Sequence, residues 1–179
     1  MSLIVGADGT DEPRNITNHP ASDGNPTWSP DGNEIAFATD RDDNFEIYAM
    51  RIDGTDSPRN LTRNPAKDVF PDWSPDPTNP QIVFRSTRNG LNQLFLFDLE
   101  TNALRRLTSS NANDDQPSWS PDASTIAFAS NRYPDDRAIS ENGKQQHYDI
   151  YLLEPASRNL LRLTSNPVDE MYPDWNPEP

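Results

Sequence analysis

The chain has 179 residues, of which 32% are hydrophobic, 25% are charged, 18 are proline and none is cysteine. Its 29 acidic residues outnumber the 15 basic ones and leave a formal net charge of −14, which argues against a nucleic-acid partner and an anionic membrane surface. The lack of cysteine excludes disulfides and zinc-thiolate sites, and no apolar run approaches the roughly 18 residues of a membrane-spanning helix, so we expect no membrane insertion.

One motif recurs four times and divides the chain into repeats of about 45 residues. Each copy has a tryptophan followed by Ser or Asn, a proline and an acidic residue, and a Leu-Thr or Ile-Thr pair precedes each tryptophan at a constant distance. The four tryptophans are Trp28, Trp73, Trp119 and Trp175. Independent motifs that recur together at one spacing indicate a repeat architecture.

The predicted elements follow these repeats in chain order. Residues 3–17 align with the second half of a repeat and predict a partial blade, that is, part of one four-stranded sheet. A complete blade at 26–62 contains four predicted strands, which are Pro26–Ser29, Glu34–Thr39, Glu46–Met50 and Arg59–Thr62. The same pattern predicts blades at 71–108 and 117–164, with a polar surface loop within 133–147, and residues 173–179 supply a further first strand to the partial blade.

The second strand of each blade indicates how the blades pack. In the first copy, Ile35 and Phe37 alternate with Ala36 and Ala38, so neither face of the strand is polar. A sheet that is covered on both faces by copies of itself is a propeller blade. We therefore predict a single all-β domain over 1–179: a β-propeller or an arc of one, with four-stranded antiparallel blades, three of them complete and one partial or shared.

The motifs Asp-x-x-Pro-x-Trp-Ser-Pro-Asp-Gly, Ile-Ala-Phe, Ile-Tyr and Leu-Thr, in this order, resemble the WD-like propeller repeat of the TolB family. The resemblance implies a non-catalytic binding module, in the periplasm or elsewhere outside the cytoplasm, that mediates protein-protein interaction. Related repeats also form propeller domains of prolyl oligopeptidase-like enzymes. The alternative is therefore a propeller segment of a larger hydrolase, a peptidase or a glycan-active protein, that gates or positions substrate.

Recurring acidic residues are the candidate partner-binding site. One stands three positions before each strand-opening proline, at Asp23, Asp68, Asp114 and Glu170. As a rim around the channel they could hold a cation or receive Lys or Arg from a cationic protein partner. Alternatively, and this is the reading we prefer, they cap the strand or pair with the recurring arginines Arg41, Arg88 and Arg132.

The remaining recurring residues predict structure rather than chemistry. A tryptophan at one repeated strand position is expected to pack between blades rather than to bind sugars or bases. No nucleophile elbow, phosphate loop or His-Glu-x-x-His motif occurs, and nothing local supplies the six or more oxygens that calcium requires, so we expect no catalytic residue, no cofactor and no metal.

Ring closure is open to three solutions. The two chain ends can share one blade within a molecule, share blades between two molecules, or belong to a longer propeller. An unclosed arc exposes apolar blade faces and sheet edges, which favours association. We therefore expect a homodimer or part of a longer propeller rather than a free monomeric arc.

Overall fold

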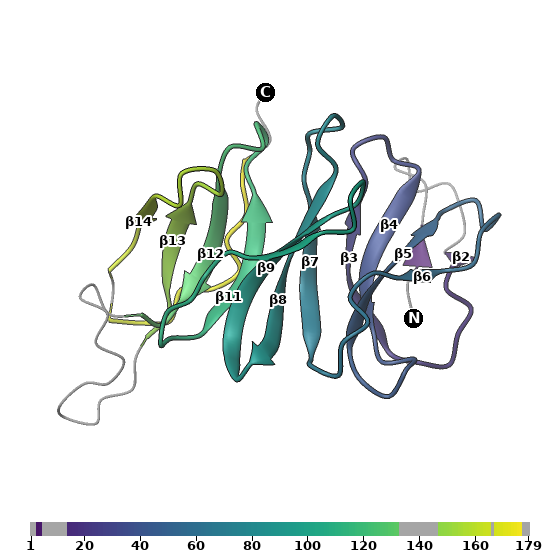
Figure 1. Cartoon of the computed structure of the whole chain (residues 1–179), viewed down its shortest axis with the longest axis horizontal. Helices are drawn as coiled ribbons and strands as arrows, with labels where there is room; N and C mark the ends of the chain where they lie inside the picture. The colour runs from purple at the N-terminus through teal and green to yellow at the C-terminus, as the bar shows by residue number, and fades with distance from the viewer. Residues whose placement is uncertain (1–2, 5–13, 133–146, 166, 177–179) are drawn as a thin grey trace.

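The computed structural model describes residues 3–4, 14–132, 147–165 and 167–176 (Figure 1). Within these residues, all regular secondary structure is β-strand, and twelve of the strands form three four-stranded antiparallel sheets. Most of the predicted loop within 133–147, residues 5–13 of the predicted partial blade and residues 177–179 lie outside the described residues. The prediction of an all-β arc built from four-stranded antiparallel blades is confirmed.

Each sheet is a meander whose strands follow one another in chain order. Blade 1 consists of β3 (Asp23–Trp28), β4 (Glu34–Thr39), β5 (Glu46–Arg51) and β6 (Arg59–Asn60). Blade 2 consists of β7 (Asp68–Trp73), β8 (Gln81–Asn89), β9 (Leu91–Asp98) and β10 (Leu104–Arg106). Blade 3 consists of β11 (Asp114–Trp119), β12 (Ile126–Ser130), β13 (Asp149–Leu153) and β14 (Leu160–Arg162). A two-stranded pair of β1 (Leu3–Ile4) and β2 (Arg14–Asn15) precedes blade 1.

The Trp-Ser-Pro-Asp motif closes the hairpin between the first two strands of a blade. In blade 1, the hydroxyl of Ser29 donates to Asp31 at 2.6 Å, and the backbone N–H of Asn33 donates to the same carboxylate at 3.0 Å. These hydrogen bonds, with that from Ser29 foremost, lower the pKa of Asp31 to about 2. Gly32 takes a left-handed φ of 69°, which glycine adopts at little cost.

Two of the three hydrophobic clusters among the described residues lie between blades, and the third, on the outward side of blade 1, consists of Ile35, Phe37, Tyr48 and Met50. Blades 1 and 2 enclose one cluster, in which Ala36, Ala38 and Ala49 of blade 1 accommodate Trp73 and Phe84 of blade 2. A second cluster between blades 2 and 3 includes Val83, Leu94, Leu107, Trp119 and Phe128. Small side chains on one blade therefore meet large ones on the next, as the alternation in the second strand predicts.

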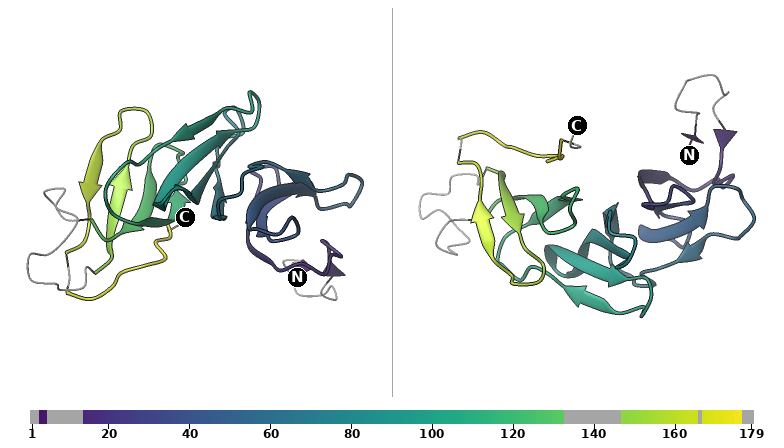
Figure 2. Two further views of the ribbon diagram at one scale, coloured as in Figure 1. Left: turned by 60° about the horizontal axis from the view of Figure 1, so that its bottom comes forward. Right: turned by 90° about the horizontal axis from the view of Figure 1, so that it is seen from above.

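The three blades form an open arc (Figure 2). Within the described residues, segment 167–176 turns back from blade 3 over the concave side of the arc, and its hydrogen bonds are with blade 3 rather than with β1 or β2. The far side of blade 3, which we call the end face, carries Ile150, Leu152, Leu161 and Leu163. Leu161 and Leu163 are each 60% exposed. The described part of the chain does not close a ring.

Candidate functional site

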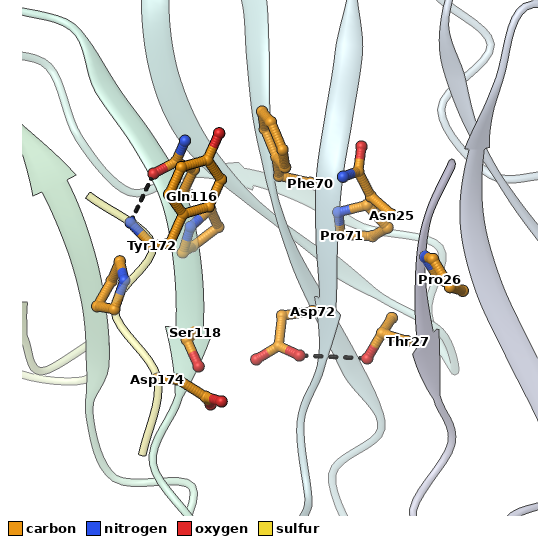
Figure 3. A pocket seen from close by; sticks show the side chains of 12 residues that line it. Asn25, Pro26, Thr27, Phe70, Pro71, Asp72, Gln116, Ser118, Tyr172 and Asp174 are labelled. Atoms are coloured by element: carbon orange, nitrogen blue, oxygen red, sulfur yellow. Dashed lines mark hydrogen bonds between the residues drawn. The ribbon is translucent and has the colours of Figure 1, made fainter. Parts of the chain in front are cut away.

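The concave side of the arc holds an open groove of about 360 Å³ (Figure 3). Each of the four repeats contributes three consecutive residues, the middle one always a proline. The lining residues are Asn25–Thr27 of β3, Phe70–Asp72 of β7, Gln116–Ser118 of β11 and 172–174 of the C-terminal segment. The groove therefore runs along the position that the central channel occupies in a propeller.

A β-bulge shapes the groove in each complete blade. The register of the first strand shifts between Gly24 and Thr27 in blade 1, and the equivalent shift occurs in blades 2 and 3. The residue before the proline takes a left-handed conformation, with φ of 49°, 54°, 53° and 58° at Asn25, Phe70, Gln116 and Tyr172. Bulges redirect side chains and interrupt pairing, and proline brings no N–H that the ladder would need. The bulge thus places a variable side chain on the groove.

In the first two repeats, the residue after the proline connects neighbouring blades. The hydroxyl oxygen of Thr27 accepts the backbone N–H of Trp73 at 3.1 Å, and Asp72 Oδ2 accepts the backbone N–H of Trp119 at 2.6 Å. The Thr27 hydroxyl also donates to Asp72 Oδ1 at 3.2 Å. A chain of hydrogen bonds therefore runs along the floor of the groove across all three blades.

The charge of the groove is negative. Burial raises the pKa of Asp72 to about 6, because desolvation disfavours the carboxylate, and the neighbouring charge of Asp174 acts in the same direction. The bonds from Trp119 and Thr27 oppose this shift. Figure 3 shows Asp72 between Thr27 on one side and Ser118 and Asp174 on the other. The lining residues include these two carboxyl groups and no lysine or arginine.

Three of the four recurring acids have buried side chains. The side chains of Asp23, Asp68 and Asp114 are 0% exposed and form ion pairs with the recurring arginines, at 3.4 Å to Arg41, 2.8 Å to Arg88 and 2.6 Å to Arg132. The pairing with the recurring arginines, which the sequence analysis preferred, is the arrangement found for these three aspartates. Glu170 is half-buried, and its backbone N–H donates to the carbonyl of Tyr148 at 2.7 Å. None of these four acids is among the residues that line the groove.

Each recurring arginine is held by stacking as well as by charge. The guanidinium carbon of Arg88 lies 4.7 Å from the ring centroid of Phe95, and those of Arg41 and Arg132 lie at 4.6 and 5.1 Å from Tyr48 and Tyr151. A planar guanidinium can stack on a ring while it bonds a carboxylate, which an ammonium does less well. This arrangement explains why the aspartates are covered.

The four tryptophans occupy different environments. Trp73 and Trp119 are each 7% exposed, between successive blades, whereas Trp28 on the outward side of blade 1 is 48% exposed. Trp175 is half-buried, and its indole N–H donates to the carbonyl of Ser118 at 3.0 Å. None of them lines the groove.

Sequence reasoning missed the groove residues on either side of the prolines. The signal that could have found them is variation within a repeat. The acid, the proline and the tryptophan recur in every copy, whereas the positions just before the proline hold Asn25, Phe70, Gln116 and Tyr172. In a repeat protein, positions that depart from the repeat at one shared location are candidates for binding.

Comparisons with known proteins identify the family. A family model described as the TolB beta propeller domain matches residues 3–103, more than half of the chain. The chain belongs to the TolB beta-propeller domain family. Among proteins of curated function, none matches the sequence.

Solved TolB structures share the fold. TolB from Agrobacterium tumefaciens is 28% identical with a TM-score of 0.69, over 85% of this chain and 52% of that one. TolB from Acinetobacter baumannii is 23% identical with a TM-score of 0.65, over 92% and 37% of the two chains. A puromycin-hydrolyzing peptidase of Mycobacterium tuberculosis is 18% identical with a TM-score of 0.63, over 89% and 23%. This TolB-type chain therefore spans about half or less of the length of these proteins.

Two further observations concern the described residues of this TolB-type arc. No helix among them has the length and apolar character that crossing a bilayer requires. In the same part of the chain, no three His, Asp or Glu side chains gather in a group that could hold a metal ion.

Proposed function

We propose that this TolB-type arc is a non-catalytic binding module of the cell envelope, which holds a segment of a partner protein along its groove. The observation that supports this most is the contrast between framework and lining. The same backbone conformation recurs in four repeats and presents four different side chains, Asn25, Phe70, Gln116 and Tyr172, to one open groove. A constant scaffold with variable contact residues is typical of repeat proteins that recognise an extended ligand.

The groove also has the composition of a recognition site. It combines aromatic rings at Phe70 and Tyr172 with amide, hydroxyl and carboxyl groups, and Tyr172 is 71% exposed. Aromatic side chains supply large contact areas in protein interfaces, and polar groups select the partner. The likeness to the peptidase, at 18% identity, concerns the fold alone and therefore does not favour a hydrolase function.

Site-specific photo-crosslinking tests this function. A benzophenone side chain is introduced in place of Tyr172 in the groove, and in a second variant in place of Leu104, which is 41% exposed on the outer strand β10. We expect a discrete crosslinked protein from position 172 and none from position 104. Equal crosslinking from both positions, or none from position 172, would overturn the proposal.

Fractionation of the same cells tests the envelope location, which recovery of the chain in the cytoplasmic fraction would contradict.

A further inference from the structure

The fold does not require the negative charge of the groove. The position after the proline needs only a hydrogen-bond acceptor for the N–H of the next tryptophan, and Thr27 supplies it with a neutral hydroxyl. Asp72 makes the equivalent bond with a carboxylate, although its burial disfavours the charged form. The third and fourth repeats carry Ser118 and Asp174 at this position. Comparison between the repeats therefore separates the structural role from the charge.

Nothing in the lining balances that charge. Asp72 and Asp174 are close enough to raise the pKa of Asp72 by repulsion, and the groove that they share has no lysine or arginine among its lining residues. The guanidinium of Arg85 stacks on the lining residue Phe70 at 5.4 Å and pairs with Asp115 at 3.5 Å, so its charge is engaged outside the groove. Like charges in a partly desolvated groove favour the arrival of a cation.

The shape of the groove suits a long cationic side chain. Its lining combines prolines and the aromatic ring of Tyr172, which is 71% exposed, with the carboxyl groups of Asp72 and Asp174. Lysine and arginine bury an apolar stem while the charged end stays in a polar environment, and aromatic faces attract cations. An apolar or acidic side chain would leave the two carboxyl groups without compensation.

We propose that the groove receives a lysine or arginine side chain of the bound segment, with its charged end between Asp72 and Asp174 and its stem along Tyr172. This inference rests on the proposed binding function and specifies its chemistry. The bound cation lowers the free energy of the ionised carboxyl groups, so it offsets the burial that raises the pKa of Asp72. Groove and partner would thus be matched by charge at one defined point.

The test uses the full chain and two synthetic peptides. One is a Gly-Ser decapeptide with a central arginine, and the other has citrulline, its neutral isostere, in that place. The backbone N–H of Trp119 donates to Asp72, so its NMR signal reports directly on the carboxylate. We expect a saturable shift of this signal with the arginine peptide and an affinity at least about tenfold lower for citrulline.

A matched pair of variants separates the groove from general attraction to an acidic protein. The double variant Asp72→Asn and Asp174→Asn is compared with Asp56→Asn and Glu100→Gln, which removes the same net charge from exposed turns outside the groove. We expect the groove variant to lose at least about tenfold in affinity for the arginine peptide and the turn variant to stay near the original value.

The outcomes distinguish this inference from the proposed function. Equal affinity for both peptides, equal losses in both variants, or no shift of the Trp119 signal at millimolar arginine peptide would each overturn the cationic site. The proposed function is judged by the crosslinks from position 172, which do not depend on the charge of the partner. A crosslinked partner together with equal binding of the citrulline peptide would leave the function in place and remove the inference.

Discussion

One arginine in each blade stabilises three neighbours at once. In blade 2, Arg88 pairs with Asp68 at 2.8 Å, its Nε donates to the hydroxyl of Ser86 at 2.8 Å, and its guanidinium stacks on Phe95. Burial raises the pKa of Asp68, and the bonds from Ser86 and Arg88 act against that shift. The arginine thus offsets the desolvation cost of a carboxylate whose side chain is 0% exposed.

We expect Arg88→Ala to lower the free energy of unfolding by about 3 kcal/mol, because it leaves the Asp68 carboxyl buried without a cation. Urea denaturation measures the change. Arg51→Ala is the control, since Arg51 pairs with Asp53 at 3.0 Å on the surface, where both side chains are about 40% exposed and solvent replaces the partner. Equal loss in the two variants would contradict the structural role of the recurring arginines.

The carboxyl group of Asp72 gives stability a distinct pH dependence. Its pKa rises from 3.8 to about 6 on folding, so between these values the folded state binds more protons than the unfolded state. Stability is therefore lost as pH rises through this window. We expect Asp72→Asn to be more stable than the original chain at pH 7.5, by on the order of 2 kcal/mol, and the difference to vanish near pH 4. Parallel unfolding profiles from pH 4 to 7.5 would contradict this.

The repeated tryptophan at the end of the first strand contributes differently to stability in different blades. Trp119 of β11 packs into the cluster between blades 2 and 3 and is 7% exposed, whereas Trp28 of β3 is 48% exposed at the outward side of blade 1. Because a blade is stabilised mainly by its neighbours, the side chain contributes only where a neighbour covers it.

At a protein concentration low enough to keep the chain a single molecule, we expect Trp119→Ala to cost about 3 kcal/mol or more of unfolding free energy and Trp28→Ala less than half of that. The two substitutions are chemically identical and fall at equivalent repeat positions, so each is the control for the other. Chemical denaturation followed by circular dichroism provides the comparison. Similar losses would show that the outward side of blade 1 is covered in solution.

The strands could be predicted from sequence where both faces are buried. The observed bounds of β4 coincide with the predicted ones, Glu34–Thr39, because apolar side chains on both faces mark the whole strand. The first strands were predicted to open at the proline, near Pro26, but β3 begins at Asp23. A bulge lets pairing resume on the other side of the proline, and a bulge has no reliable signature in composition.

The candidate site was harder to predict than the fold. Recurrence identified Asp68 and its equivalents, but their accessibility depends on the stacked arginine above each of them, which is a tertiary contact. Asp72 was missed because two of its three equivalents, Thr27 and Ser118, do not share its charge. Recurrence identifies the framework, whereas the positions that carry the proposed binding function are those that differ between copies.

For the whole molecule, the consequence of an open arc is an uncovered end face. Leu107 of blade 2 is 7% exposed because blade 3 packs against it, and its repeat equivalent, Leu163, is 60% exposed. At the other end of the arc, Trp28 projects from the position at which Trp119 enters such a face. A second copy of the chain therefore offers a complementary surface, and the two ends can join by the contact already used between blades.

We expect the chain to associate in solution, so that light scattering gives twice the single-chain mass of 20.2 kDa at micromolar concentration. Replacing Leu161 and Leu163 by lysine should restore the single-chain mass, because charges on the end face oppose burial. A matched pair at Leu91 and Leu104, which are 39% and 41% exposed, should leave the mass unchanged. A single-chain mass for the original sequence would contradict association.

Because the residue before each proline is left-handed in all four repeats, each repeat presents one side chain to the groove in the same way. The backbone conformation is the same at Asn25, Phe70, Gln116 and Tyr172, and only the side chain differs. A single substitution can therefore change one lining side chain while the backbone of the groove is retained. Duplication or exchange of whole repeats can change the order of these side chains along the groove, so a propeller of this kind can acquire a new binding specificity without a new fold.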